Sequence, residues 1–443
     1  MNVLLVHRNF PAQYLHLARF LRDRGHRAVF ITCPTENQLR AVEKVEYAFD
    51  APLNEAIHPG ARDFEEALRR ADAVAMAATR LKAAGFRPDI IVGHHGWGEL
   101  LNIGDVWPDV PLLGYFEFYY HTDGNEVGFD AEFQTGPETR PWVRARNAVN
   151  LLALTNPGWG QTPTEFQLAT YPERFQHRIS LIREGIDLQA CSPAPALRSA
   201  PLDLGAMVQD PALRAALGKA TLAPTDKLVT YVNRSLEPCR GMHILMRALP
   251  KLLAREDVHV AVVGTEGGGY GPRLSDGRTW KEYFIQEMKG TYDASRLHFM
   301  GLTPYDDYRT LLRRSDAHVY LTYPFVASWS LREALATGCA VIASETPPVR
   351  EFIQHERNGL LTPFFDPQAL ATRVLDLFED EWLDGHIRAS ARAYAERHLS
   401  MPAYLDRYWA LIRALTGEGG SRPETAVASL EQRRRESPVQ PSC

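Results

Sequence analysis

The sequence lacks most of the features that mark a secreted, zinc-bound or membrane-spanning protein. Its 443 residues include five scattered cysteines, Cys33, Cys191, Cys239, Cys339 and Cys443, and no CxxC pair. Such a set argues against a disulfide framework and against a zinc site. No stretch reaches the roughly 18 apolar residues of a membrane span, and the first apolar run is too short for a secretion signal. We therefore expect a cytoplasmic protein, with peripheral membrane contact left open.

An excess of positive charge is also missing. The formal net charge of -5 argues against a nucleic acid partner. The composition, with 45% hydrophobic and 23% charged residues, is that of an ordinary globular protein. Because 443 residues exceed the size at which a single core stops growing, we expect two domains.

Short apolar runs alternate with helical patterns along most of the chain, which predicts βαβ units and parallel sheets. The expected strands are NVLLVH, RAVFIT, PDIIVGH, VPLLGYFEF, NLLALTN and RISLIREG in the first half, and KLVTYV, VHVAVVG, RLHFMG, AHVYLTY and CAVIAS in the second. The pattern therefore indicates two doubly wound α/β halves.

The domain boundaries follow from changes in this pattern. We expect domains at residues 1–190 and 227–400, joined by a connection with a small insertion at 191–226. A helix at 401–417 is expected to pack across the domains, because its apolar residues share one face. The polar tail at 418–443 lacks aromatic residues and is expected to be disordered.

Residues that follow the strands are the best candidates for a site, because parallel sheets bind ligands at the carboxyl ends of their strands. Arg234 and Arg240 follow KLVTYV, and Gly241 then opens a helix. Two guanidinium groups beside a helix N-terminus suit a diphosphate. Two exposed loop arginines are an equally good interpretation.

The residues that follow the other strands give less specific signals of a binding site. The glycine-rich loop from Gly264 to Gly271 could approach a ligand, or could be a flexible surface turn. His94 and His95 are adjacent, so they point in different directions and do not suggest a paired metal site. One of them could face a cleft, or be a structural histidine. Glu333 lies three residues after Ser330, which is the spacing of a helix capping box.

Longer segments resemble a known family. The segments VNRSLEPCRGMHILMRAL, VAVVGTEGG, LHFMGLTPYDDYRTLLRRSDAHVYLTYPF and SWSLREALATGCAVIASETPPVREFIQHERNGLL resemble the C-terminal half of the family-4 retaining glycosyltransferases of GT-B fold. The segments VHRNFPAQYLHLARFLRDRGHRAVFIT, GYFEFYYHTDG and TPTEFQLATYPERFQHRISLIREGID resemble a bacterial subgroup with a PFVxSWS-type loop. The resemblance implies two Rossmann-like domains that face a central cleft.

The resemblance also implies a donor site. A nucleotide-diphosphate sugar would bind mainly to the C-terminal domain, with Arg234 and Arg240 on the diphosphate and Glu333 on the ribose. Phe325 stands where the family has the first glutamate of its E-x7-E signature, and we expect it to form an apolar wall beside the donor sugar. Gly264, Ser328 and Trp329 complete the expected donor contacts.

For catalysis, the resemblance points to the strand end at GYFEF. The family often has a histidine there, whereas this chain has Glu117, with His121 four residues on. We name Glu117, His121 and His95 as catalytic candidates. A structural ion pair is the other interpretation of Glu117. No Asp-x-Asp follows a strand, so we expect neither a catalytic metal nor a cofactor apart from the donor.

The expected function is retaining, metal-independent transfer of a sugar to a small-molecule, glycan or lipid-linked acceptor. Two alternatives remain. A sugar-nucleotide 2-epimerase of the same fold would act on the donor without an acceptor. A catalytically silent nucleotide-sugar-binding protein is the other alternative, because Phe325 and Glu117 depart from the family pattern.

Overall fold

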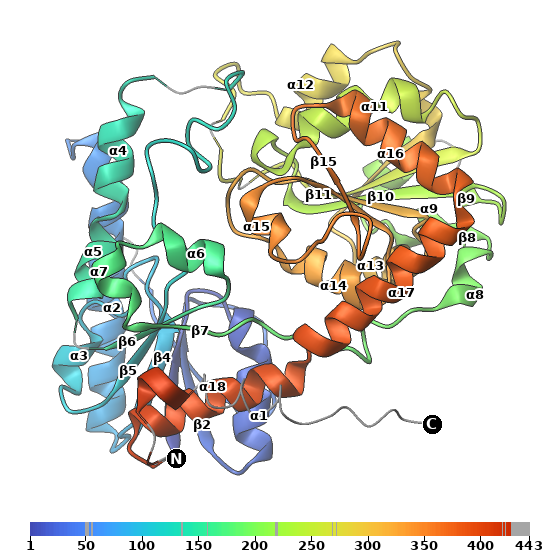
Figure 1. The fold of residues 1–443 in the computed structure, drawn as a ribbon. Helices are drawn as coiled ribbons and strands as arrows, with labels where there is room; N and C mark the ends of the chain where they lie inside the picture. Colours follow the sequence, from blue (N-terminus) through green and yellow to red (C-terminus); the bar gives the residue numbers. More distant parts are fainter. Residues whose placement is uncertain are drawn as a thin grey trace, which may run out of the picture. The chain divides into compact units, whose positions relative to one another are not determined.

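The computed structural model of the chain divides into two compact units (Figure 1). The first unit contains Met1–Gly128, Gln134–Glu184 and Pro402–Cys443, and the second contains Phe129–Phe133 and Gly185–Met401. The structure describes residues 1–48, 53–54, 56–133, 136–156, 158–217, 220–267, 269–271, 273–418, 420 and 422–426. Within these ranges, no helix is both long enough and apolar enough to cross a membrane.

The first unit is built on a seven-stranded parallel sheet with the order β3-β2-β1-β4-β5-β6-β7. Its strands are β1 (Asn2–Val6), β2 (Arg27–Thr32), β3 (Glu43–Glu46), β4 (Ile90–His94), β5 (Leu112–Tyr115), β6 (Trp159–Thr162) and β7 (Ile179–Leu181). Consecutive residues of β1, from Val3 to Val6, are all buried. Because successive side chains point to opposite faces, both faces of this sheet are covered, as in other parallel α/β sheets.

Helices provide that cover. They are α1 (Leu15–Asp23), α2 (Arg62–Ala83), α3 (Ile103–Val106), α4 (Thr139–Arg146), α5 (Ala148–Thr155), α6 (Glu165–Thr170), α7 (Glu173–Gln176) and α18 (Met401–Leu415), with 3-10 turns η1 (Ala12–Tyr14) and η2 (Pro59–Ala61). Val74 of α2 packs in one apolar cluster with Leu4 and Ile91 of the sheet.

The C-terminal helix α18 packs on the first unit. It lies beside α1 in Figure 1. Its Trp409 ring packs against the rings of Phe20 and His26. Beyond it, residues 423–426 are helical and Ala426 is buried. The tail predicted at 418–443 is thus ordered at this point, while residues 427–443 lie outside the described residues.

One predicted strand is wrong. Residues 150–155 of the segment NLLALTN belong to helix α5, and the strand of this region is β6, Trp159–Thr162. A short apolar run does not distinguish a buried strand from a buried helix. The strand β6 itself reads WGQT and has no apolar alternation. The short strands β3 and β15 (Leu360–Thr362) were not predicted either.

The second unit has a six-stranded parallel sheet with the order β12-β11-β10-β13-β14-β15. Its other strands are β10 (Lys227–Ser235), β11 (Val258–Thr265), β12 (Leu297–Gly301), β13 (Ala317–Tyr320) and β14 (Val341–Ser344). The strand order reverses between β10 and β13, as it does between β1 and β4 in the first unit. The carboxyl ends of these strand pairs are the places where a doubly wound sheet binds ligands.

Helices again surround the sheet. They are α11 (Met242–Leu252), α12 (Trp280–Glu287), α13 (Tyr305–Arg314), α14 (Trp329–Thr337), α15 (Pro347–Arg350), α16 (Pro367–Glu379) and α17 (Glu381–His398), with 3-10 turns η3 (Pro238–Arg240) and η4 (Ala294–Arg296). Leu311 of α13, Leu335 of α14 and Ala391 of α17 share one core cluster with the sheet.

The segment predicted as an interdomain connection packs on the second unit. It contains α8 (Pro195–Arg198), β8 (Leu202–Asp203), α9 (Leu204–Met207), α10 (Pro211–Ala216) and β9 (Thr221–Leu222), with β8 and β9 antiparallel. Cys191, Leu204 and Leu222 are fully buried in the same core cluster as α13 and α14.

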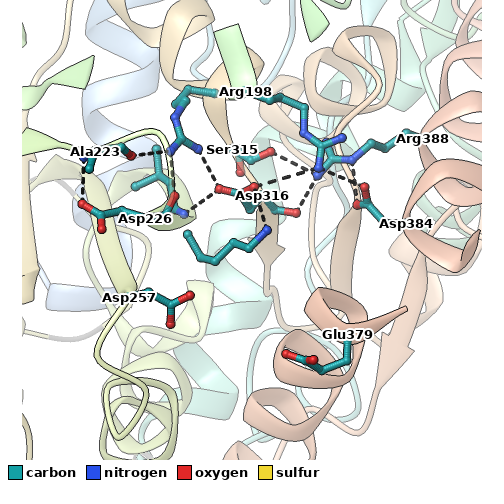
Figure 2. A network of polar contacts seen from close by, with 12 residues as sticks. Arg198, Ala223, Asp226, Asp257, Ser315, Asp316, Glu379, Asp384 and Arg388 are labelled. Carbon is teal, nitrogen blue, oxygen red and sulfur yellow. Dashed lines mark hydrogen bonds and ion pairs between the residues drawn. The ribbon is translucent and has the colours of Figure 1, made fainter. Parts of the chain in front are cut away.

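A buried polar network closes the amino-terminal edge of this sheet (Figure 2). Asp316 accepts hydrogen bonds from the Arg314 guanidinium at 2.7 Å and from the backbone N–H of Leu228 at 2.8 Å. Arg388 donates to the Asp316 carbonyl and to the Asp384 carboxylate, which also pairs with Arg198. Arg314 is only 1% exposed, so its charge depends on Asp316 for compensation.

We expect the change Asp316→Ala to lower the free energy of unfolding of the second unit by about 3 kcal/mol, because it leaves a buried guanidinium without its carboxylate. Guanidinium chloride unfolding measures this. Asp376→Ala removes an exposed carboxylate from α16 and is the matched control, with an expected change below about 0.5 kcal/mol. Equal effects of the two changes on the free energy of unfolding would contradict the role of Asp316 as the counter-charge of Arg314.

Candidate functional site

Arg240 lies at the strand switch of the second unit, between the carboxyl ends of β10 and β13. Its Nη1 donates to Thr322 Oγ1 at 2.9 Å and to the Val326 carbonyl at 2.8 Å. The next residue, Gly241, has a φ of 75°, and a Cβ there would lie 2.4 Å from Leu321 Cβ. Glycine therefore lets the chain turn directly from η3 into the first turn of α11.

Arg240 forms no ion pair within the described part of the chain, although the Glu237 carboxylate acts on its charge at longer range. The side chain is buried, and the other groups beside its guanidinium are the rings of Tyr270 and Phe325, at 5.3 and 5.5 Å from Cζ to the ring centres. A buried cation without a counter-ion is costly to maintain. This arrangement favours an anionic ligand at the N-terminus of α11.

The ends of β10 and β11 approach each other closely. Gly264 has a φ of 155°, and a Cβ there would lie 2.4 Å from the Asn233 carbonyl oxygen. Arg234, the residue after Asn233, is exposed. Gly264 was predicted to contact the sugar donor, and the structure gives it a packing role between the two strand ends. The Arg234 side chain is open to solvent.

Glu237 holds the glycine-rich loop that follows β11. Its carboxylate accepts hydrogen bonds from the backbone N–H groups of Tyr270 at 3.0 Å and Gly271 at 2.8 Å. These two hydrogen bonds anchor the described part of the loop. They argue against the flexible surface turn that the glycine-rich composition also allows. Gly268 and Pro272 lie outside the described residues. Sequence reasoning did not identify Glu237, because an acidic residue in a loop has many uses.

Glu333 is not part of a capping box. Helix α14 has Ser328 at its N-cap, and the Ser330 hydroxyl is bonded to that of Ser328. The Glu333 carboxylate instead accepts hydrogen bonds from the hydroxyls of Tyr305 at 2.7 Å and Tyr308 at 2.8 Å. Burial raises the pKa of Glu333, and the two tyrosine hydrogen bonds oppose part of that shift.

The loop before α14 contains the other predicted donor residues. Phe325 is only 2% exposed, so it is not an open wall of the site. The Ser328 N–H donates to the Tyr320 hydroxyl at 2.8 Å. Trp329 is 40% exposed at the start of the helix. The structure therefore brings Phe325 together with Arg240, and leaves Trp329 open to solvent.

Residues Phe129–Phe133, which come from the N-terminal half of the chain, dock in the second unit. Asp130 accepts a hydrogen bond from the Tyr323 hydroxyl at 2.6 Å and lies 3.1 Å from His243 Nε2. The ring of Phe129 packs against that of Tyr323. Because the Tyr323 N–H donates to the Cys239 carbonyl, this segment supports the backbone just before Arg240. No sequence signal distinguished it.

The first unit has a cavity of about 230 Å³ at its own strand switch. The cavity is lined by Arg8, Asp63, Glu66, Ala67, Arg70, His94, Gly96, Trp97, Glu117, Phe118, Tyr120, Arg146, Val149 and Asn150. The lining contains residues that follow β1, β4 and β5, which is where a parallel sheet places its ligand-binding side chains.

His94 is the histidine that lines this cavity. Its Nδ1 accepts a hydrogen bond from the Gly96 N–H at 2.9 Å, so in the neutral ring the proton is on Nε2. That Nε2 is buried and lies 3.6 Å from Glu117 Oε2. The ring of His94 stacks on Trp97 with their centres 4.0 Å apart. His94 and Glu117 are therefore neighbouring polar groups in one cavity wall.

The other two histidine candidates do not line the cavity. The ring of His95 is buried beside Phe116, and a Cβ at Gly114 would lie 2.0 Å from it. Burial lowers the pKa of His95 to about 3, and the charge of His94 acts in the same direction. His121 Nε2 is bonded to the Thr170 carbonyl at 2.7 Å. His95 is thus enclosed and His121 is hydrogen-bonded outside the cavity, and their catalytic role stays a prediction.

Two arginines of the cavity form no ion pair among the described residues. Arg8 lies 5.3 Å from the ring centre of Trp97, and Arg146 lies 4.1 Å from that of Tyr120. Within the described ranges, neither guanidinium has an ion-pair partner, whereas Arg70 pairs with Glu66. No cluster of three or more metal-ligating side chains was found among the described residues. The cavity is therefore suited to an anionic or polyhydroxylated ligand.

Comparison with known proteins covers both units. The model of the glycosyl transferase family 4 group matches residues 24–191, and that of glycosyl transferases group 1 matches residues 215–398. The phosphatidyl-myo-inositol mannosyltransferase of Mycolicibacterium smegmatis is 30% identical over 46% of this chain and 51% of its own. The D-inositol 3-phosphate glycosyltransferase of Jonesia denitrificans is 26% identical over 50% of this chain and 48% of its own. The chain spans about half the length of these relatives.

Solved structures share the fold. HepE of Anabaena in complex with UDP and glucose has a TM-score of 0.63 at 18% identity, covering 92% of this chain and 98% of its own. Sucrose-phosphate synthase of Thermosynechococcus elongatus has a TM-score of 0.68 at 18% identity, covering 94% and 99%. These matches confirm the predicted fold class of two parallel-sheet α/β domains. Together with the two family models, they show that the chain belongs to the family-4 glycosyltransferases of GT-B fold.

Proposed function

We propose that the protein is a retaining glycosyltransferase that takes its sugar from a nucleotide-diphosphate sugar. The observation that carries this proposal is the buried Arg240 guanidinium, which lies at a helix N-terminus without a carboxylate partner among the described residues. A diphosphate supplies the missing negative charge. Arg234 is exposed at the end of the neighbouring strand and would add a second cation.

Glu333 would bind the ribose hydroxyls of the donor. Each of its oxygens accepts one tyrosine hydroxyl, and a carboxylate has about four acceptor positions in total. The carboxylate therefore keeps capacity for ribose hydroxyl donors. HepE, which has the same fold, was solved with UDP, and UDP is the first nucleotide to test.

The acceptor would bind in the cavity of the first unit. A volume of about 230 Å³ suits a group of about one sugar ring. Arg8 and Arg146 favour a phosphate on the acceptor, and Glu117 with His94 would orient its hydroxyls. The names of two relatives specify phosphatidylinositol and inositol phosphate, so a phosphorylated polyol is the acceptor class that we propose.

In the transfer, the bond between the anomeric carbon and the diphosphate oxygen breaks, an acceptor hydroxyl oxygen bonds to that carbon, and the proton of that hydroxyl leaves with the diphosphate. Negative charge develops on the leaving diphosphate. Arg240 is fixed in place before the reaction, so it would stabilise that charge without reorganisation. We propose that this stabilisation replaces a catalytic metal. An epimerase needs no acceptor, so the charged cavity favours transfer over that alternative.

We expect Arg240→Ala and Arg234→Ala each to weaken UDP binding by about 1.5–3 kcal/mol, the scale of a hydrogen bond to a charged group. Isothermal titration measures this, and turnover of a labelled donor should be the same with and without EDTA. Arg397→Ala, an exposed site on α17, is the control. Unchanged UDP affinity in both variants would overturn the donor site, and metal-dependent turnover would overturn the metal-independent step.

Glu333 makes the stability of the second unit dependent on pH. Because its pKa is raised in the folded state, folding favours the protonated carboxyl, and this contribution is lost as pH rises above the ordinary value of 4.5. The free energy of unfolding of the wild type should therefore fall with pH relative to that of Glu333→Gln. The exposed Glu256→Gln is the control. A difference that does not change between pH 4.5 and 8 would contradict this assignment.

The acceptor cavity gives a separate test. Arg8→Gln and Arg146→Gln should each weaken binding of inositol 3-phosphate by about tenfold, because each removes one charged contact to phosphate, and should leave binding of inositol unchanged. Titration in the presence of UDP measures the affinities for inositol 3-phosphate and for inositol. Arg144→Gln, an exposed change on the same helix α4, is the control. Equal losses for the neutral and the phosphorylated ligand would refute phosphate recognition here.

A further inference from the structure

Phe325 stands where the resemblance places a sugar-binding glutamate, and its ring lies in a contact set that the sequence did not reveal. The ring centres of Phe325 and Tyr270 are 4.9 Å apart at an interplanar angle of 61°. Arg240 Cζ lies 5.5 Å from the first centre and 5.3 Å from the second. The guanidinium is therefore flanked by two aromatic rings that also contact each other.

Backbone contacts close this arrangement. The Val326 carbonyl, one residue after Phe325, accepts a hydrogen bond from Arg240. Glu237, which precedes the turn that carries Arg240, accepts one from the Tyr270 N–H. The turn, the glycine-rich loop and the loop before α14 are thus joined around one guanidinium.

Aromatic rings and a carboxylate would affect Arg240 in opposite ways. A carboxylate at position 325 would pair with the guanidinium and neutralise it, and a diphosphate would then have to compete for the same cation. An aromatic face stabilises the cation without supplying a counter-charge. The planar guanidinium also suits such a site better than the compact ammonium of lysine, which the family usually has at this place.

We propose that Phe325 and Tyr270 are positioning residues that hold Arg240 in place and keep its charge available for the donor diphosphate. This inference rests on the donor site proposed above. It assigns Phe325 a role toward the phosphates and not toward the donor sugar. Arginine at 240 and phenylalanine at 325 then form one unit, in which each residue depends on the other.

This assignment reverses the outcome expected from an apolar wall beside the sugar. An apolar wall beside the sugar predicts that Phe325→Glu leaves the affinity for the free nucleoside diphosphate unchanged and alters only the relative affinities for different donor sugars. Contact with Arg240 predicts that Phe325→Glu weakens the binding of free UDP and of UDP-sugars by the same factor, because the new carboxylate pairs with the guanidinium in both cases. A loss confined to UDP-sugars would overturn the proposal.

Tyr270 allows a milder test, because it is 41% exposed and its replacement leaves the core intact. We expect Tyr270→Leu and Phe325→Leu each to weaken UDP binding by about fivefold, which corresponds to about 1 kcal/mol. Tyr270→Phe retains the ring and should bind UDP as the wild type does. Trp382→Leu, an exposed aromatic change on α17, is the control.

A double-mutant cycle in the full chain identifies the route of the effect. In an Arg240→Ala background, Phe325→Leu and Tyr270→Leu should cause no further loss of UDP affinity, because the group they position is gone. Additive losses would refute a role through Arg240. If Arg240→Ala weakens UDP binding and Tyr270→Leu does not, the positioning role is wrong and the proposed donor site still stands. If wild-type protein binds none of UDP, GDP and ADP, both the donor site and this inference fall.

Discussion

The desolvated charge of Arg240 is the constraint on which the rest of the proposed donor site depends. Burying a guanidinium costs free energy, and the fold offsets this cost through Thr322, the Val326 carbonyl and two aromatic rings. Among the described residues no carboxylate forms an ion pair with it, and Glu237 acts on it only at longer range. The folded protein therefore holds an anion-binding group in place before any ligand arrives, which is the condition for effective electrostatic stabilisation of a leaving group.

Several residues without ligand-binding chemistry are explained by this constraint. Gly241 allows the chain to pass Leu321 into α11, and Gly264 allows the ends of β10 and β11 to meet. Asp130 reaches the same region from the N-terminal half of the chain, where it binds the Tyr323 hydroxyl. The surroundings of Arg240 in the second unit thus include a short segment whose sequence neighbours belong to the first unit.

The first unit repeats the same design with different chemistry. Its cavity also lies at the strand switch, but Arg8 and Arg146 are partly exposed and accompanied by acidic groups. Such a mixed lining suits hydroxyl groups together with one phosphate, whereas the second unit offers a buried cation to a diphosphate. The two linings therefore differ as expected for the proposed charged donor and the proposed polyhydroxylated acceptor.

The sequence by itself determined the two parallel α/β halves, because strand and helix periodicity and the motifs at strand ends are local. It also placed Arg240 and Glu333 at those ends. Only the tertiary structure decided which side chains meet. His94 and not His95 faces the cavity, because the direction of each ring depends on how β4 packs beside β5. The contacts of Phe325 with Arg240, and of Asp130 with Tyr323, join residues 85 and 193 positions apart, and no local pattern records such pairs.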